Sequence, residues 1–106
     1  MDKDQIYLAE IKEFCGKIIS FTTGLTFEQF VSEEKTYLSV VKLIENVGEA
    51  SKRLSPETKS SYSQVDWGKA AKMRDRLVHH YMDIDLAIVF DVATNEIPKL
   101  LTSLTA

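Results

Sequence analysis

The sequence has little of several residue types, and each shortage excludes a class of protein. Its 106 residues include one cysteine, two prolines and four glycines. The single cysteine, Cys15, excludes a disulfide framework within the chain and favours a reducing, cytoplasmic setting. No apolar run is long enough to cross a bilayer. The first residues lack a basic segment followed by an apolar stretch, so no secretory signal is predicted.

The overall composition is that of an ordinary soluble globular chain. Hydrophobic residues make up 44% of the sequence and charged residues 27%, which is typical of a folded protein and not of a disordered one. A chain of this length forms one core, so residues 1–106 are predicted to be a single domain. The net charge is −3, which taken as a whole argues against a nucleic-acid-binding protein.

The charge is nevertheless distributed unevenly. Residues 67–82 contain four basic residues and one acidic residue, a net charge of +3, whereas the remainder contains nine basic and fifteen acidic residues, a net charge of −6. Both histidines, His79 and His80, lie in the basic segment. A polyanion would therefore meet one attractive face on a repulsive body, although a solvated helix flank gives the same pattern.

The spacing of apolar residues predicts helices along the whole chain. The predicted helices span roughly residues 2–22, a short helix capped by Thr26 and ending at Phe30, residues 33–54, a short segment opened by Ser55-Pro56, residues 67 to about 81, and a last helix capped by Asp83 or Asp85. Gly24 ends the first helix, Gly48 is interpreted as permitting close contact between helices, and Pro98 is expected to bend or loosen the last helix. The predicted fold class is all-α, an antiparallel bundle of four to five helices.

Arg74 breaks the pattern of its own helix. On a helical wheel of residues 67–81, Arg74 lies near the middle of the apolar arc. A guanidinium stays charged in any protein, and burying it without a partner is costly. An acidic residue, a neighbouring subunit or an anionic ligand must therefore meet it. Glu45 and Glu49 are the candidate acidic partners within the chain.

His79 follows Arg74 on the same predicted helix. The two side chains are separated by about 140° around the helix and by a rise of about 7.5 Å, so one helix does not bring both onto one small ligand. Asp75, four residues before His79, can accept the imidazole N–H and fix its tautomer for proton transfer, although such pairs are also common on ordinary helix surfaces. His80 is interpreted as accessory. Tyr81 shares the face of Arg74 and either reaches the same pocket or packs at the edge of the core.

Other chemistries are weakly represented in the sequence. Two histidines and one distant cysteine give no zinc-binding spacing, and there is no glycine-rich phosphate loop. Cys15 has no nearby basic side chain that would activate it, so it is interpreted as a packing residue. Neither a metal nor a cofactor is predicted.

The segment Arg74-Asp75-Arg76-Leu77-Val78-His79-His80-Tyr81 resembles the signature of HEPN domains. The tyrosine two positions after His79 narrows the resemblance to HepT-like proteins, the toxin half of HepT–MntA toxin–antitoxin pairs. Further segments are similar to that family: 23–30, 46–55, Asp66-Trp67, 83–85 and 97–100. The resemblance covers nearly the whole chain, and Glu33, where the family usually has aspartate, is a conservative departure.

This resemblance implies a helical HEPN fold that forms a homodimer, with the motifs of two subunits facing a shared cleft. The implied activity is that of a type VII-like toxin, a metal-independent endoribonuclease that uses the ribose 2′-hydroxyl as nucleophile. Arg74, His79 and Asp75 would be the catalytic residues. The RNA backbone would be held by Lys69, Lys72, Arg76 and His80. An MntA-like minimal nucleotidyltransferase, acting as antitoxin, would inactivate the protein by transferring AMP from ATP to Tyr81.

A second function remains open at this point. The chain is alternatively a catalytically silent helical partner that binds a nucleotidyltransferase and is modified by it. The combination of Arg74, Asp75 and His79 favours the enzyme, because a docking module has no need of all three. The overall acidity of the chain favours the silent partner.

Overall fold

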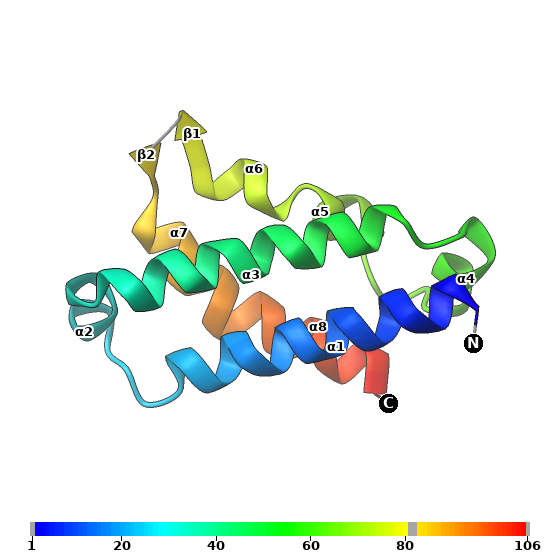
Figure 1. The fold of residues 1–106 in the computed structure, drawn as a ribbon, viewed down its shortest axis with the longest axis horizontal. Coiled ribbons are helices and arrows are strands. Elements are labelled where there is room, and N and C mark those ends of the chain that lie inside the picture. The colour runs from blue at the N-terminus through cyan, green and yellow to red at the C-terminus, as the bar shows by residue number, and fades with distance from the viewer. Residues whose placement is uncertain (1, 81–82, 106) are drawn as a thin grey trace.

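The computed structural model describes residues 2–80 and 83–105, except the side chain of His80, and is dominated by helices (Figure 1). Tyr81 and the side chain of His80, both singled out in the sequence, lie outside this part. In chain order the elements are α1 (Lys3–Thr22), α2 (Phe27–Ser32), α3 (Glu34–Lys52), α4 (Pro56–Ser61), α5 (Trp67–Ala71), α6 (Met73–Leu77), β1 (Val78–His80), β2 (Asp83–Ile84), α7 (Leu86–Asp91), a π-helical segment η1 (Val92–Glu96) and α8 (Ile97–Thr105). The predicted all-α helical-bundle fold is confirmed, with a two-stranded hairpin added to it.

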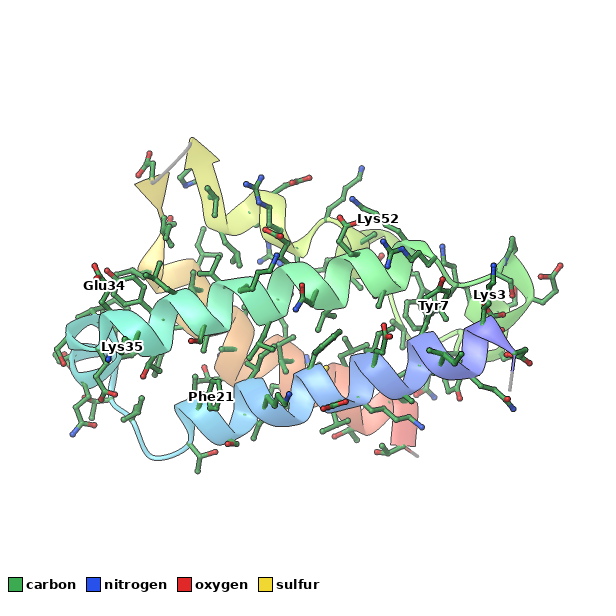
Figure 2. The ribbon with its side chains drawn as sticks, viewed as in Figure 1. Lys3, Tyr7, Phe21, Glu34, Lys35 and Lys52 are labelled. Atoms are coloured by element: carbon green, nitrogen blue, oxygen red, sulfur yellow. The ribbon has the colours of Figure 1, made fainter. Side chains whose placement is uncertain are left out.

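The two longest helices, α1 and α3, form an antiparallel pair at the centre of the fold (Figure 1). The segments α7, η1 and α8 run behind this pair, while α5 and α6 follow the side of α3 that faces away from α1. Lys3 and Tyr7 on α1 and Lys52 on α3 lie at one end of the bundle, and Glu34 and Lys35 lie at the other (Figure 2). No helix in residues 2–80 and 83–105 has the length and apolar character needed to cross a membrane.

Several helices begin where the sequence predicts, because local capping groups are present. Thr26 forms the predicted capping box, in which its side chain accepts from the Gln29 amide at 3.1 Å. Gly24 has φ +82° in the preceding turn, a conformation that glycine adopts without steric cost. Ser55 accepts from the Thr58 amide and precedes Pro56 at the start of α4. These short-range interactions fix most of the helix boundaries.

One cluster of buried side chains joins the helices. Its fully buried members recur at helical spacing along α1 and α3, as the sequence pattern requires. They include Ile11, Cys15 and Ile18 on α1, Val40, Ile44 and Val47 on α3, Leu77 on α6, Val89 on α7, Val92 and Ala93 on η1, and Ile97 on α8. Each buried aliphatic side chain stabilises the fold by about 1.5–3 kcal/mol relative to exposure. Cys15 is fully buried in this cluster, in agreement with its predicted packing role, and burial raises the pKa of its thiol to about 12.

Gly48 allows α5 to approach α3 closely. A Cβ atom at this position would lie 3.2 Å from the carbonyl oxygen of Ala71 and 3.3 Å from that of Ala70. These are backbone atoms, which cannot rotate away as a side chain can. The predicted close contact between helices is therefore confirmed, and it sets the distance between α3 and the segment that leads to Arg74.

The predicted continuous helix over residues 67–81 is wrong. Lys72, with φ −105° and ψ 9°, separates α5 from α6, and Val78 has extended backbone, with φ −126° and ψ 110°. The carbonyl of Leu77, which a longer helix would use internally, accepts instead from the amide of Asp85 at 2.7 Å. Residues 78–80 are a β-branched valine and two histidines, which are weak helix formers. The chain therefore continues into the β1–β2 hairpin.

The C-terminal helix is interrupted near Pro98, as predicted. Asp85, and not Asp83, caps α7 by accepting from the Ile88 amide at 3.1 Å. Proline has no N–H, so it removes one hydrogen bond of a regular helix. The residues just before it form the wider turn of η1, in which the Ile97 amide donates to the carbonyl of Val92, five residues earlier.

Candidate active site

The residues of the Arg-x4-His motif lie on α6, which runs along α3, and on β1, which rises from the edge of the bundle (Figure 1). Met73 and Leu77 bury their side chains and hold α6 against the core. Val78 and Ile84 pair across the antiparallel hairpin. Buried apolar side chains thus hold α6 against the core, and pairing with β2 holds β1.

Arg74 is half-exposed in the single chain, although the helical wheel places it within the apolar arc. Its side chain is 48% exposed, its Nε lies 3.7 Å from Glu45 Oε2, and its Nη1 lies 4.0 Å from Asp75 Oδ1. Because α6 has only five residues, Met73 and Leu77 suffice to bury its inner face, and Arg74 falls at the rim. Of the two candidate partners within the chain, the structure selects Glu45; Glu49 pairs with Lys52 at 3.3 Å. Exposed ion pairs of this kind contribute about 0–1 kcal/mol, so an anionic ligand can displace Glu45 at little cost.

His79 contacts Asp85, and the predicted contact with Asp75 is absent among the ion pairs of the described residues. His79 Nε2 lies 3.6 Å from Asp85 Oδ2, and the imidazole is 51% exposed. The spacing of four residues between Asp75 and His79 brings them together only on a helix, and the helix ends at Leu77. The Asp75 carboxylate is 73% exposed and lies beside Arg74 instead.

Arg76 and Lys69, predicted to bind the RNA backbone, share a carboxylate that the sequence analysis did not single out. Arg76 donates two hydrogen bonds to Glu96, of 2.8 and 3.0 Å, and Lys69 Nζ lies 3.3 Å from the same carboxylate. The Glu96 side chain is only 18% exposed. The hydrogen bonds from Arg76 lower the pKa of Glu96 against the opposing effect of burial, with Lys69 adding to the decrease. The partnership with Glu96 likewise raises the pKa of Arg76.

We expect Glu96→Gln to lower the free energy of unfolding by about 1–2 kcal/mol at pH 7, because two charge-assisted hydrogen bonds in a partly exposed pair are weakened. A lowered native pKa means that this stabilisation is present above the ordinary glutamate pKa and is lost as the pH falls through the native one. The free energy of unfolding of the wild type should therefore fall more steeply than that of the variant as the pH drops below about 4.5. Urea unfolding between pH 3 and 7 measures both effects.

Glu49→Gln is the matched control for this prediction. Glu49 also contacts a lysine, but both side chains are more than half exposed, so the decrease in stability should stay below about 0.5 kcal/mol. Equal decreases in the two variants would contradict a structural role for Glu96.

Of the cations predicted to bind the RNA backbone, Lys72 is the one most accessible to a ligand. It lies between α5 and α6 with an exposed side chain. Among residues 2–80 and 83–105, no ion pair joins it to a carboxylate. The remaining two residues of the predicted site, His80 and Tyr81, have no described side chains.

A cavity of about 200 Å³ lies between α5 and α8, and Glu96 is one of its lining residues. Its polar lining includes Lys69, Glu96 and Lys99, over a floor formed by Ala70, Met73 and Leu100. Neither Arg74 nor His79 lines it, so it is separate from the motif. In the described part of the chain, no group of three or more histidine, cysteine, aspartate or glutamate side chains is arranged to hold a metal ion.

Two residues next to the motif escape sequence reasoning for the same reason. Asp85 is expected from the sequence only as a helix cap, and Glu96 is not expected to contact the basic segment at all. Both contacts depend on how separate elements pack, which local periodicity does not encode. The one available signal for Asp85 is the run of weak helix formers at residues 78–80, which marks a break in the helix before the next cap.

Comparison with known proteins gives a consistent set of relatives. The family model "Ribonuclease HepT-like" matches residues 11–106. "Probable ribonuclease HepT" of Thermococcus cleftensis is 34% identical over 94 residues, covering 89% of this chain and 86% of that protein. "Putative RNase MJ0127" of Methanocaldococcus jannaschii is 38% identical over 93 residues, covering 88% and 77%. "Putative RNase TTE0752" of Caldanaerobacter subterraneus subsp. tengcongensis is 35% identical over 94 residues, covering 89% and 84%. No solved structure gives a significant match.

Proposed function

The chain belongs to the HepT-like ribonuclease family, and we propose that it is a metal-independent endoribonuclease, the toxin of a type VII-like toxin–antitoxin pair. The observation that supports the proposal most directly is the exposure of the two motif side chains and the carboxylate beside each. Arg74 and His79 are both about half exposed, and each is held beside a carboxylate, Glu45 and Asp85, that leaves it accessible. A cation and an imidazole presented in this way are the groups that cleavage of a phosphodiester requires.

The proposed reaction is a transfer of the phosphoryl group within the RNA strand. The 2′-oxygen attacks the adjacent phosphorus, the bond from phosphorus to the 5′-oxygen breaks, and a 2′,3′-cyclic phosphate and a 5′-hydroxyl form. His79 takes the proton from the 2′-hydroxyl or gives one to the departing 5′-oxygen. The Arg74 guanidinium neutralises the phosphate as negative charge accumulates in the transition state, which requires that it leave Glu45 for the substrate.

A homodimer would supply two copies of each group to one phosphate. One imidazole then acts as base and the other as acid, which a single chain with one motif cannot provide. Leu38 supports this assembly, because it is 45% exposed on α3 and lies seven residues before Glu45, on the same helix face. An apolar side chain exposed on the helix face that carries Glu45 is the kind of residue that a second subunit would cover.

The proposed RNA contacts follow the basic segment. Lys72 would contact a phosphate directly, whereas Lys69 would divide its contacts between RNA and Glu96. Arg76 is held by two hydrogen bonds to Glu96, so its role in binding RNA would be to contribute positive potential more than a direct contact. Binding through a few cations of this kind weakens as the salt concentration rises.

Incubation of the purified protein with single-stranded RNA in the presence of EDTA tests the reaction class. We expect cleavage to continue, and the products to end in a 2′,3′-cyclic phosphate and a 5′-hydroxyl. Cleavage that EDTA abolishes, or products with a 5′-phosphate, would reject the proposed reaction. The protein expressed alone should also arrest growth.

The alternative function, a catalytically silent partner of a nucleotidyltransferase, is favoured by the acidic groups beside the motif, since Glu45, Asp75 and Glu96 all oppose RNA binding. In both functions the partner is an MntA-like nucleotidyltransferase, which acts as antitoxin only if the chain is a toxin. The Tyr81 hydroxyl would attack the α-phosphorus of ATP and release pyrophosphate, leaving AMP on the tyrosine and adding negative charge beside the motif.

We expect the intact mass of the protein to rise in steps of one adenylate after incubation with this partner and ATP, and to stay constant in Tyr81→Phe. Modification that blocks RNA cleavage supports the toxin. Modification of a protein that never cleaves RNA supports the silent partner, and an unchanged mass of the wild type would contradict both accounts of Tyr81.

A further inference from the structure

We infer that Asp85 is the positioning residue for His79: its carboxylate holds a proton on His79 Nε2 and leaves Nδ1 as the nitrogen that exchanges a proton with RNA. This inference rests on the proposed function for its catalytic meaning. The contact on which it depends is that of Asp85 Oδ2 with His79 Nε2, at 3.6 Å. That distance fits an ion pair and shortens to a hydrogen bond through a small rotation of an exposed imidazole.

Three constraints fix the position of Asp85. Its amide donates to the carbonyl of Leu77, a fully buried residue at the end of α6. Its Oδ1 accepts from the Ile88 amide and caps α7. The residue before it, Ile84, pairs with Val78 in the hairpin. The backbone of Asp85 is therefore held at the end of α6 and the start of α7, and its carboxylate joins the Ile88 amide through Oδ1 and His79 through Oδ2.

Asp75, the carboxylate expected from sequence to orient His79, has none of these constraints. It is 73% exposed and contacts Arg74 at 4.0 Å, whereas the Asp85 side chain is 33% exposed. A carboxylate that is already ordered loses less conformational entropy when it orients a neighbour than a mobile one does. Orientation of a catalytic imidazole by such a group is the arrangement that fixes which ring nitrogen carries the proton.

Asp85→Asn separates positioning from structure. Asparagine is as good a helix cap as aspartate, so α7 should keep its N-terminus. Its side-chain amide can present N–H to Nε2, which would force the proton onto Nδ1 and leave the imidazole in the wrong tautomer. Asp66→Asn is the matched control, because Asp66 also caps a short helix, accepting from the Lys69 amide at 2.9 Å. Among the described residues, no hydrogen bond or ion pair joins Asp66 to His79.

Two measurements on the full chain test the inference, one of them independent of catalysis. We expect Asp85→Asn to lower kcat for RNA cleavage by about 10²–10⁴-fold with KM changed by less than about threefold, while Asp66→Asn stays within about twofold of the wild type and both variants keep their unfolding midpoint. Nitrogen-15 NMR near pH 8.5, about two units above the ordinary imidazole pKa, should show His79 protonated on Nε2 in the wild type and on Nδ1 in Asp85→Asn. His79→Ala assigns the signals, because the chain has only two histidines.

The outcomes separate the two proposals. If kcat of Asp85→Asn is close to that of the wild type, or if wild-type His79 carries its proton on Nδ1, the positioning role is overturned. If the wild type cleaves no RNA, the proposed function fails and the NMR result alone decides the inference: protonation on Nε2 supports it, and protonation on Nδ1 overturns it.

Discussion

His79→Ala should lower the rate of RNA cleavage by about 10²–10⁴-fold, the usual contribution of a general acid or base. The fold should be retained, because the imidazole is half exposed and its ion pair with Asp85 is partly exposed. Such a substitution usually changes the free energy of unfolding by no more than about 0.5 kcal/mol. Single-turnover cleavage of a labelled RNA, with urea unfolding of the same preparation, measures both quantities.

Growth arrest provides the cellular counterpart of this measurement. Expression of the wild type alone should degrade RNA and stop growth, and expression of His79→Ala should do neither. If His79→Ala arrests growth as the wild type does, the toxicity arises outside the motif. If the variant fails to fold, its loss from the soluble fraction of the cell lysate reveals this.

Arg74→Lys should lower kcat/KM by about 10²–10³-fold, the usual effect of removing a donor that stabilises transition-state charge. Lysine keeps the positive charge, but it lacks the planar set of donors with which arginine binds two phosphate oxygens at once. The stability should barely change, because the ion pair that Arg74 forms with Glu45, at 3.7 Å, is exposed. Steady-state cleavage kinetics at a fixed salt concentration give the ratio.

Arg53→Lys is the control, because it makes the same exchange of arginine for lysine away from the motif. Arg53 follows α3 at the opposite end from the hairpin, where its guanidinium lies 6.0 Å from the centre of the Tyr7 ring. The same exchange at this position should leave cleavage unchanged. If Arg74→Lys also cleaves RNA at the wild-type rate, only the charge of residue 74 matters, and the proposed contact of its guanidinium with two phosphate oxygens is wrong.

The sequence predicts the helices that depend on local signals. The capping box at Thr26 and Gln29, the turn at Gly24 and the start of α4 at Ser55 are interactions between residues close in the chain, and their residue types are sufficient to specify them. The close approach at Gly48 was also predictable, because a glycine inside an apolar helical pattern is costly unless something packs against it. The break near Pro98 follows from the missing N–H of proline.

The site itself was only partly predictable. A helical wheel for residues 67–81 assumes one helix, but the hydrogen bond from the Asp85 amide to the Leu77 carbonyl joins residues on either side of a hairpin, and periodicity carries no information about it. Because the helix ends at Leu77, the expected pairing of Asp75 with His79 does not form. Arg74, which the wheel places among apolar side chains, is half-exposed in the single chain. The identity of the motif residues was available from the sequence, and so was Glu45 as one of two candidate partners of Arg74. The contacts of Asp85 and Glu96 became visible only from the packing of separate elements.

The wide turn of η1 has a consequence for how the end of the chain is aligned. In a regular α-helix each residue advances about 100° around the axis, so one surplus residue would rotate everything beyond it by that angle. A π turn accommodates such a residue within one wider turn of the backbone. Val89 before it and Leu100 after it are both buried, so the apolar face of the helix stays on the core across the turn. The same turn carries Glu96 to Arg76. Deleting or inserting one residue within Val92–Glu96 would therefore rotate α8 relative to α7 about the helix axis. It would also move Glu96 relative to Arg76 in the motif.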